Sequence, residues 1–174
     1  MTRRIGVIGL GNVLMGDDAL GPYTVRTLES VYNLPTSVSL LDLGTPGPDL
    51  ADYIRDFEAI IVVDTLRADG LPGEVRTYRR PEIVSAPISP RISPHEPGLR
   101  EALLTSELTG DGPGEVLLVG VIPSSVSAGT GLSPAVFAAH PRVRKIVLGE
   151  LERLGAPAEE RVQPEPADIW WESG

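Results

Sequence analysis

The sequence predicts an α/β protein, a three-layer α/β/α sandwich around a five-stranded, mostly parallel twisted sheet with one antiparallel edge strand. Two observations support this prediction. Short apolar runs alternate along the chain with segments whose apolar residues recur at helical spacing. The run from Ala59 to Val63 contains no polar residue, which is typical of a central strand covered on both faces. The chain has 174 residues, enough for one continuous core.

The predicted strands are apolar or alternate between apolar and polar residues. They cover residues 5–10, 38–43, 59–63, 73–78 and 115–122. A crossover between parallel strands needs about a dozen residues or more. The fourth strand follows the third too closely for such a crossover, so we expect residues 73–78 to run antiparallel at an edge of the sheet.

The predicted helices cover residues 20–32, 48–55, 98–108 and 133–154. In the first of them Leu20, Tyr23 and Leu28 recur at the spacing of one helix face. We expect Ser133 to cap the last helix, because serine is a good N-cap residue. We expect Pro141 to kink or restart that helix, because proline lacks the N–H that a helix interior needs.

Proline sets the remaining boundaries. Residues 80–97 are predicted to be one loop, because no helix interior tolerates the prolines at positions 81, 87, 90, 94 and 97. We expect one α/β domain over residues 1–155. A Pro- and Glu-rich, loosely ordered tail is expected over residues 156–174, with Trp170 and Trp171 packing back on the domain.

Composition excludes several kinds of site. The chain has no cysteine, which rules out disulfides, thiolate nucleophiles, zinc fingers and iron–sulfur clusters and leaves oxygen and imidazole as metal ligands. The net charge of −9 argues against a nucleic-acid partner. The chain has no apolar stretch of about 20 residues and no recognisable signal sequence, so we expect no membrane span and a cytoplasmic location.

The glycine-rich turn at residues 9–21 joins the first predicted strand to the first helix. Such turns typically bind phosphate, yet this one holds the adjacent carboxylates of Asp17 and Asp18 and no basic residue. It would therefore repel a phosphate and attract a divalent cation. Leu14 stands where the dinucleotide-binding pattern has its third glycine, and a side chain of that size would impede close packing of helix and strand. The turn favours a metal or a cationic group over a nucleotide.

Three residues stand out as candidate metal ligands. Asp18 follows the first strand, Asp64 ends the third, and His95 stands late in the proline-rich loop. The carboxyl ends of strands are where α/β sheets bind ligands, and two carboxylates with one imidazole suit nickel, zinc or iron. Each also has an ordinary explanation, since Asp18 can cap a helix, Asp64 at a strand end can be a turn residue, and a lone histidine such as His95 in a loop often has no special role. Asp17 is more readily explained as a loop brace or a solvated turn residue than as a ligand.

Motifs spread along nearly the whole chain resemble, in matching order, those of the [NiFe]-hydrogenase maturation endopeptidases. They cover residues 9–14, 17–21, 42–47, 62–64, 93–96 and 119–123. The resemblance implies an endopeptidase that removes a short C-terminal peptide from the hydrogenase large-subunit precursor after nickel has been inserted.

The resemblance also implies roles for individual residues. Its metal-contacting positions carry over to Asp18, Asp64 and His95. Relatives often have Glu at the first of these, so the metal is expected to lie slightly differently against the shorter Asp18. A loop that the family links to proteolysis carries over to residues 42–47, which makes Asp42 a candidate catalytic carboxylate, although Leu43 replaces a small residue of some members.

On this interpretation the nickel arrives with the substrate, bound to the cysteine thiolates of the precursor, and zinc or cadmium can replace it in a crystal. The metal would serve as the recognition element, and Asp18, Asp42 or Asp64 as the base that activates a water molecule. The expected partner is the precursor, with no nucleic acid and no membrane, and the expected state is a monomer. The alternatives are a self-contained metal-dependent peptidase and a non-catalytic metal- or nucleotide-binding module.

Overall fold

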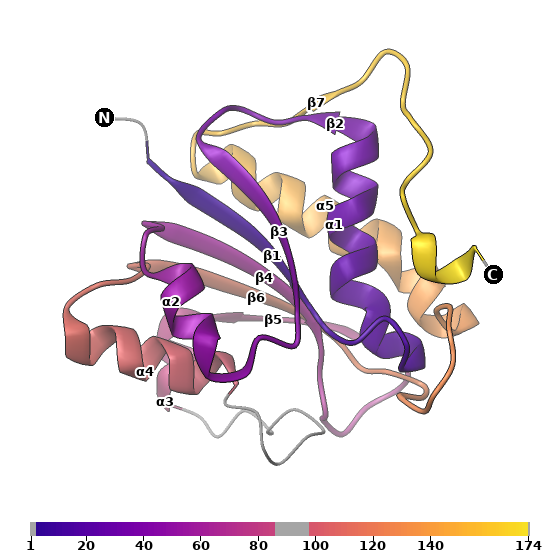
Figure 1. Cartoon of the computed structure of the whole chain (residues 1–174), viewed down its shortest axis with the longest axis horizontal. Coiled ribbons are helices and arrows are strands. Elements are labelled where there is room, and N and C mark those ends of the chain that lie inside the picture. Colours follow the sequence, from indigo (N-terminus) through magenta and orange to yellow (C-terminus); the bar gives the residue numbers. More distant parts are fainter. Residues whose placement is uncertain (1–2, 86–97, 174) are drawn as a thin grey trace.

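The computed structural model describes residues 3–85 and 98–173, which form an α/β sandwich around a five-stranded sheet (Figure 1). The strands are β1 (Ile5–Leu10), β3 (Val38–Gly44), β4 (Ala59–Thr65), β5 (Val75–Arg79) and β6 (Glu115–Val121). Their order across the sheet is β3-β1-β4-β6-β5. All neighbouring strands are parallel except β5, which runs antiparallel to β6 at one edge, so the predicted fold class is confirmed.

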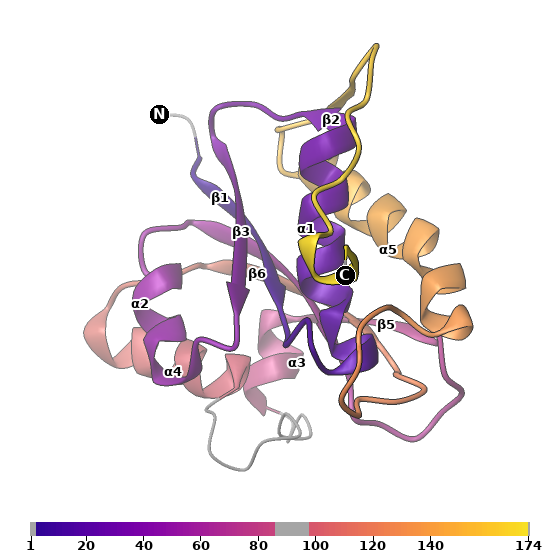
Figure 2. The same cartoon turned by 45° about the vertical axis from the view of Figure 1, so that its right-hand side comes forward.

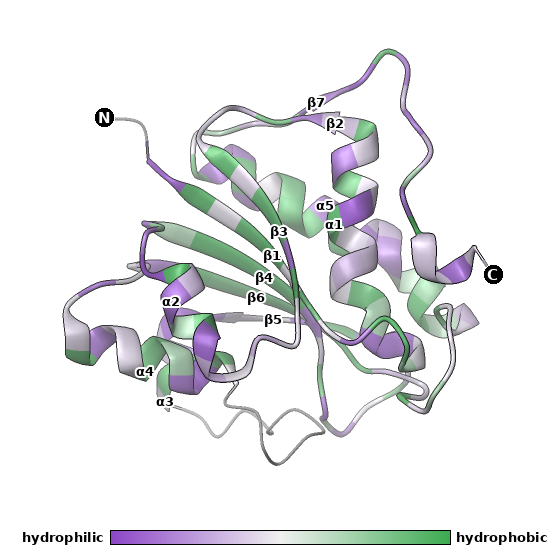
Figure 3. Cartoon of the chain, in the orientation of Figure 1, coloured by the Kyte–Doolittle hydropathy of each residue, from purple (hydrophilic) through white to green (hydrophobic). Residues whose placement is uncertain are grey.

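Helices cover both faces of the sheet (Figure 1 and Figure 2). One face carries α1 (Leu20–Val31) and α5 (Pro134–Arg153), and the other carries α2 (Leu50–Ile54), α3 (Arg80–Ser85) and α4 (Leu99–Thr109). Strand residues alternate between two apolar cores, so that Val7 packs on the α1 side and Ile8 on the α2 side. Because β1, β4 and β6 are covered on both faces, they are largely hydrophobic, as the colours of Figure 3 show.

The register of the parallel strands decides which residues meet at the carboxyl edge of the sheet. Gly9 of β1 lies between Asp42 of β3 and Val63 of β4. The next residue of β4, Asp64, pairs with Gly120 of β6. The strands therefore bring Asp42 and Asp64 to the edge from which the glycine-rich turn starts.

One predicted loop is partly helical. Residues 80–85 form α3, whereas the proline pattern predicts a loop throughout residues 80–97. Pro81 is the second residue of α3, where the backbone N–H has no partner within the helix and proline costs little. Ile83 stabilises the helix, because its side chain is fully buried in the core that also contains α4. His95 and the other prolines of the predicted loop lie outside the described residues.

The last helix, α5, runs from Pro134 to Arg153 without a break, so of the two outcomes predicted for Pro141, a kink or a restart, the restart is wrong. Pro141 is exposed, and the carbonyl group that it leaves without a partner can therefore bond to water. Burial of the apolar inner face of α5 offsets the cost of about 3 kcal/mol of an interior proline. Ser133 caps the helix as predicted, since its hydroxyl accepts the N–H of Val136. In the described part of the chain, no helix is long and apolar enough to cross a bilayer.

The tail folds back along α1. β2 (Tyr32–Asn33) pairs antiparallel with β7 (Glu159–Glu160), and the N–H of Arg161 donates to the carbonyl of Val31 at 2.8 Å. The side chain of Trp171 is only 6% exposed, so the prediction that the tryptophans pack back is confirmed for this residue. The described residues also form short 3₁₀ helices at η1 (Gly16–Ala19), η2 (Gly47–Asp49) and η3 (Trp170–Glu172).

Candidate active site

Glycines let the turn after β1 pack tightly against the start of α1. Gly21, in the first turn of α1, lies so close to the sheet that a Cβ atom there would be 2.6 Å from the carbonyl oxygen of Val63 and closer still to the backbone of Leu10. Leu14, by contrast, is 55% exposed and does not lie between helix and strand. The close approach that the dinucleotide pattern assigns to its third glycine is therefore made by Gly21, further along the chain.

Asp18 is brought to the edge of the sheet by this turn. Gly11 has a φ of 144°, a conformation that other residues rarely adopt, and a Cβ atom there would collide with the carbonyl oxygen of Asp18. The carboxylate of Asp18 accepts the N–H of Asn12 at Oδ2 (2.7 Å) and the hydroxyl of Thr65 at Oδ1 (3.0 Å). Asp18 therefore does not cap α1, whose N-cap residue is Ala19, and instead links the turn to the end of β4.

Asp64 and Thr65 form the end of β4. Asp64 is 7% exposed, and its Oδ1 accepts a hydrogen bond of 2.8 Å from the backbone N–H of Thr65. Thr65 thus donates to both predicted carboxylate ligands, to Asp18 through its hydroxyl and to Asp64 through its N–H. The two carboxylates, which lie far apart in the sequence, meet at one residue on the carboxyl edge of the sheet.

Asp42 lies near the end of β3, at the same edge of the sheet, and its side chain interacts with α1. Its Oδ2 is 3.5 Å from Nη2 of Arg26, a guanidinium that also lies 3.6 Å from Glu29. Leu40, two residues earlier on β3, packs in the core under α1, so Asp42 follows the alternation toward that face. Asp42 is therefore ion-paired with α1, whereas Asp18 and Asp64 are joined by Thr65.

Asp17 braces the loop after β6. Its side chain is 1% exposed, so the interpretation as a solvated turn residue is wrong and that of a loop brace is confirmed. Its carboxylate accepts the N–H groups of Ser124 (2.8 Å), Ser125 (3.2 Å) and Ser133 (2.6 Å) and the hydroxyl of Ser133 (2.9 Å). These bonds hold residues 124–133 against the turn that carries Asp18.

The structure describes only one of the two histidines. His95, the third predicted ligand, lies outside the described residues, and its role stays a prediction. Within residues 3–85 and 98–173, no three His, Asp or Glu side chains gather closely enough to hold a metal ion. His140 is buried in α5, with its ring 4.8 Å from that of Tyr23. Burial and the nearby Arg144 lower the pKa of His140 to about 4, so its imidazole is neutral at pH 7 and acts as a core residue.

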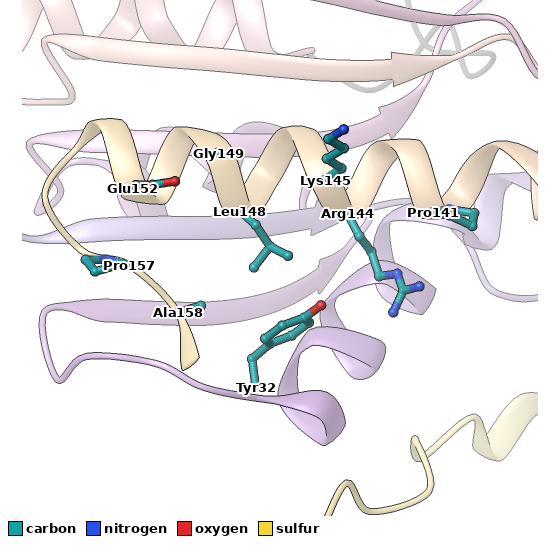
Figure 4. A pocket seen from close by; sticks show the side chains of 9 residues that line it. All are labelled: Tyr32, Pro141, Arg144, Lys145, Leu148, Gly149, Glu152, Pro157 and Ala158. Atoms are coloured by element: carbon teal, nitrogen blue, oxygen red, sulfur yellow. The ribbon is translucent and has the colours of Figure 1, made fainter. Parts of the chain in front are cut away.

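A separate hollow of about 500 Å³ lies at the other end of α1 (Figure 4). Tyr32, Arg144, Leu148 and Pro157 are among the residues that line it. Since α1 has 12 residues, its far end is about 18 Å from Leu20 at the usual rise per residue. The end of the hollow at Tyr32 is therefore remote from the carboxylates at the strand ends, and the hollow contains no predicted site residue.

The carboxylates at the carboxyl edge of the sheet are groups of the kind that bind cations and activate water. A carboxylate has about four lone-pair sites, and the two hydrogen bonds described for Asp18 occupy two of them. Carboxylates are ligands that divalent cations accept, and a carboxylate can also take a proton from a water molecule.

Comparison with known proteins agrees with the motifs of the sequence. The sequence profile HycI, described as hydrogenase maturation protease, matches residues 22–150. The chain is 37% identical over 156 residues to the hydrogenase 2 maturation protease of Escherichia coli (strain K12), which spans 89% of this chain and 94% of that protein. The chain belongs to the hydrogenase maturation protease family. It is also 32% identical over 150 residues to the hydrogenase expression/formation protein HupD of Rhodobacter capsulatus, spanning 83% of this chain and 71% of that protein.

Solved structures of hydrogenase maturation proteases share the fold. The hydrogenase maturating endopeptidase HybD from E. coli has a TM-score of 0.84 at 36% identity, over 91% of this chain and 98% of that one. The hydrogenase 2 maturation peptidase from Thaumarchaeota archaeon SCGC_AB-539-E09 has a TM-score of 0.63 at 36% identity, over 86% and 98% of the two chains. The predicted family and the predicted enzyme class, an endopeptidase, are confirmed. This finding disfavours a non-catalytic binding module.

Thr65, the residue that donates a hydrogen bond to each of the two carboxylates, is not evident from the sequence. The available signal is its position directly after Asp64, but threonine is common in strands because its β-branched side chain suits them. The partner of Asp18 on its other side is the backbone N–H of Asn12, which carries no side-chain signal at all.

Proposed function

We propose that this hydrogenase maturation protease removes a short C-terminal peptide from the nickel-loaded large-subunit precursor of a [NiFe]-hydrogenase. The observation that carries the proposal is the meeting of Asp18 and Asp64 at Thr65, on the carboxyl edge of the sheet. That edge is where α/β proteins bind their ligands. Membership of the family supports an endopeptidase cleavage as the reaction.

Nickel belongs to the substrate in this proposal. In the precursor it is bound by cysteine thiolates, and Asp18, Asp64 and His95 would complete its coordination with the oxygen and imidazole ligands that a divalent transition metal accepts. A precursor without nickel lacks this docking point and is not cut. The protease therefore acts only after metal insertion.

Cleavage needs a polarised carbonyl group, a water molecule and a base. Nickel close to the scissile peptide would polarise its carbonyl group. Asp18, Asp42 and Asp64 are the candidate bases. Because Asp42 is ion-paired with Arg26 while Asp18 and Asp64 share Thr65, we favour Asp18 or Asp64 as the base. The chain has no cysteine and cannot form a thioester with its substrate.

The test mixes the purified protein with nickel-loaded or nickel-free large-subunit precursor and follows the products by mass spectrometry. We expect the shortened product from the nickel-loaded precursor only. Asp18→Asn and His95→Ala are expected to abolish processing while leaving the fold intact. Asp111→Asn is the matched control, because Asp111 is exposed between α4 and β6, and it is expected to process at the wild-type rate.

Two results would contradict the proposal. One is cleavage of the nickel-free precursor at the same rate as the loaded one. The other is a wild-type rate for both Asp18→Asn and His95→Ala. A metal retained through purification, together with cutting of short unrelated peptides, would favour the self-contained metal-dependent peptidase instead.

A further inference from the structure

Thr65 makes two hydrogen bonds that differ in kind. Its hydroxyl donates to Oδ1 of Asp18 at 3.0 Å, and its backbone N–H donates to Oδ1 of Asp64 at 2.8 Å. The first bond depends on the identity of the side chain, whereas the second would be made by any residue other than proline. A substitution at this position can therefore release Asp18 while leaving the bond to Asp64 in place.

We propose that Thr65 is a positioning residue that sets the orientation of the Asp18 carboxylate toward the metal carried by the substrate. The inference rests on the proposed function, since it takes Asp18 and Asp64 as groups that face a common cation. Thr65 itself does not touch the cation in this proposal. It acts through the hydrogen bond from its hydroxyl to Asp18.

The Asp18 carboxylate is held on both oxygens. Oδ1 accepts the Thr65 hydroxyl, and Oδ2 accepts the N–H of Asn12 at 2.7 Å. The carboxylate cannot rotate about its last bond without losing one of these two hydrogen bonds. Since each oxygen has about two lone-pair directions, the pair of bonds selects the directions in which Asp18 accepts a cation.

The donor stands on a rigid element. Thr65 is the last residue of β4, a strand that lies between β1 and β6, and it is paired with Val121. The following residue, Leu66, donates its N–H to the carbonyl of Val121 at 2.9 Å, which continues the pairing past the strand end. Threonine has few accessible rotamers because it is β-branched. A donor on a well-ordered strand can hold a ligand more precisely than one on a loop.

The expected effect of replacing Thr65 follows from what is known of residues that hydrogen-bond to the ligands of a metal. Loss of a hydrogen bond that orients a metal-binding side chain typically lowers metal affinity or activity by about 10- to 100-fold. Thr65→Val keeps the size and branching of the side chain and replaces only the hydroxyl with a methyl group. Thr65→Ser keeps the hydroxyl and removes the methyl group.

The first experiment titrates the purified protein with Cd²⁺ alone and measures the dissociation constant by calorimetry. We expect Thr65→Val to bind Cd²⁺ at least about tenfold more weakly than the wild type, and Thr65→Ser to restore most of the affinity. Thr77→Val, the same exchange on the exposed side of the edge strand β5, is the control and is expected to bind as the wild type does. If Thr65→Val does not fold, as judged by its melting transition, Thr65→Ala replaces it.

Three results would overturn the positioning role. These are equal Cd²⁺ affinity of Thr65→Val and the wild type, a Thr65→Ser variant as weak as Thr65→Val, and a wild type that does not bind Cd²⁺. Processing of nickel-loaded precursor by the same variants separates this inference from the proposed function. If the wild type binds Cd²⁺ more tightly than Thr65→Val but does not process the precursor, the function fails and the positioning role stands. If the wild type and Thr65→Val process equally well, the positioning role fails and the function stands.

Discussion

The carboxylate of Asp17 accepts a hydrogen bond of 2.6 Å from the N–H of Ser133, the residue that caps α5. The two residues are 116 positions apart in the sequence. Together with the bonds to Ser124 and Ser125, this contact holds the loop after β6 against the turn that carries Asp18. The shape of the site therefore depends on a buried acid that is not itself a candidate ligand.

Asp17→Asn is expected to lower the free energy of unfolding by about 2–4 kcal/mol. The substitution removes the charge and turns an NH₂ donor toward groups that are themselves donors. Urea unfolding followed by circular dichroism measures the change. Asp111→Asn, on an exposed residue, should change the same quantity by less than about 0.5 kcal/mol. A loss at Asp17 no larger than this control would mean that the brace is dispensable.

Gly21→Ala is expected to lower the free energy of unfolding by several kcal/mol. This is at least as much as is typical of substitutions that add atoms to a well-packed core. The new methyl group would lie 2.6 Å from the carbonyl oxygen of Val63, which belongs to the backbone and cannot move aside. Gly149→Ala in α5 is the matched control, because no atom lies within 4 Å of its added Cβ and alanine favours the helix by about 0.5–1 kcal/mol. The melting temperature should fall for Gly21→Ala and rise for Gly149→Ala. If both melting temperatures rise, the close approach of Gly21 to the sheet does not restrict the side chain at this position.

Glu150 on α5 lies between Arg79 and Arg153 and is 6% exposed. Its burial opposes ionisation, but the hydrogen bonds from Arg153 and Arg79 outweigh burial and lower the pKa of Glu150 to about 2, from the ordinary value of 4.5. The unfolded chain therefore binds this proton more tightly than the folded one. The stabilisation is complete above pH 4.5 and is lost as the pH falls toward 2.

Glu150→Gln should lower the free energy of unfolding at pH 7 by about 1–2 kcal/mol, a figure reduced because both arginines are half-exposed. The difference from the wild type should shrink as the pH is lowered below 4.5. Urea unfolding at several pH values between 3 and 7 tests this. Glu152→Gln, on the exposed neighbour in α5, serves as control. A difference that does not change with pH would contradict the assigned pKa.

His140 predicts a second pH dependence in a different range. Burial and Arg144 lower the pKa of His140 from 6.5 to about 4, so the unfolded chain takes up this proton first. The stability should be complete above pH 6.5 and fall between 6.5 and 4, by up to about 3 kcal/mol. His140→Phe keeps an aromatic ring against Tyr23 and should flatten this part of the curve of melting temperature against pH. Identical curves for the two proteins would rule out His140 as the group responsible.

Much of the fold is predictable from the sequence because burial on both faces of a sheet leaves continuous apolar runs. The run Ala59–Val63 marks β4, and the short connection to β5 indicates the antiparallel edge. Asp18 follows the first strand, and Asp42 and Asp64 stand near the ends of the next two, which correctly indicates that all three residues lie at one edge of the sheet.

The remainder depends on contacts between residues that lie far apart in the chain. The helix α3 forms in spite of Pro81 because Ile83 is buried in a core that no local pattern reveals. The contact of Thr65 with Asp18 spans 47 positions and depends on side-chain orientation, as does the pairing of Asp42 with Arg26. The spacing of residues along the chain carries no information about such directions.

The return of the tail along α1 decides where a fusion partner can be attached. Arg3 pairs with Glu115 at the first residue of β6, on the amino side of the sheet. Glu172 lies beside Gly131, in the loop that leaves the opposite side. If the precursor docks at the carboxylates as proposed, an affinity tag placed ahead of Arg3 is expected to leave it access, whereas a bulky domain joined beyond Glu172 is expected to compete with it for space.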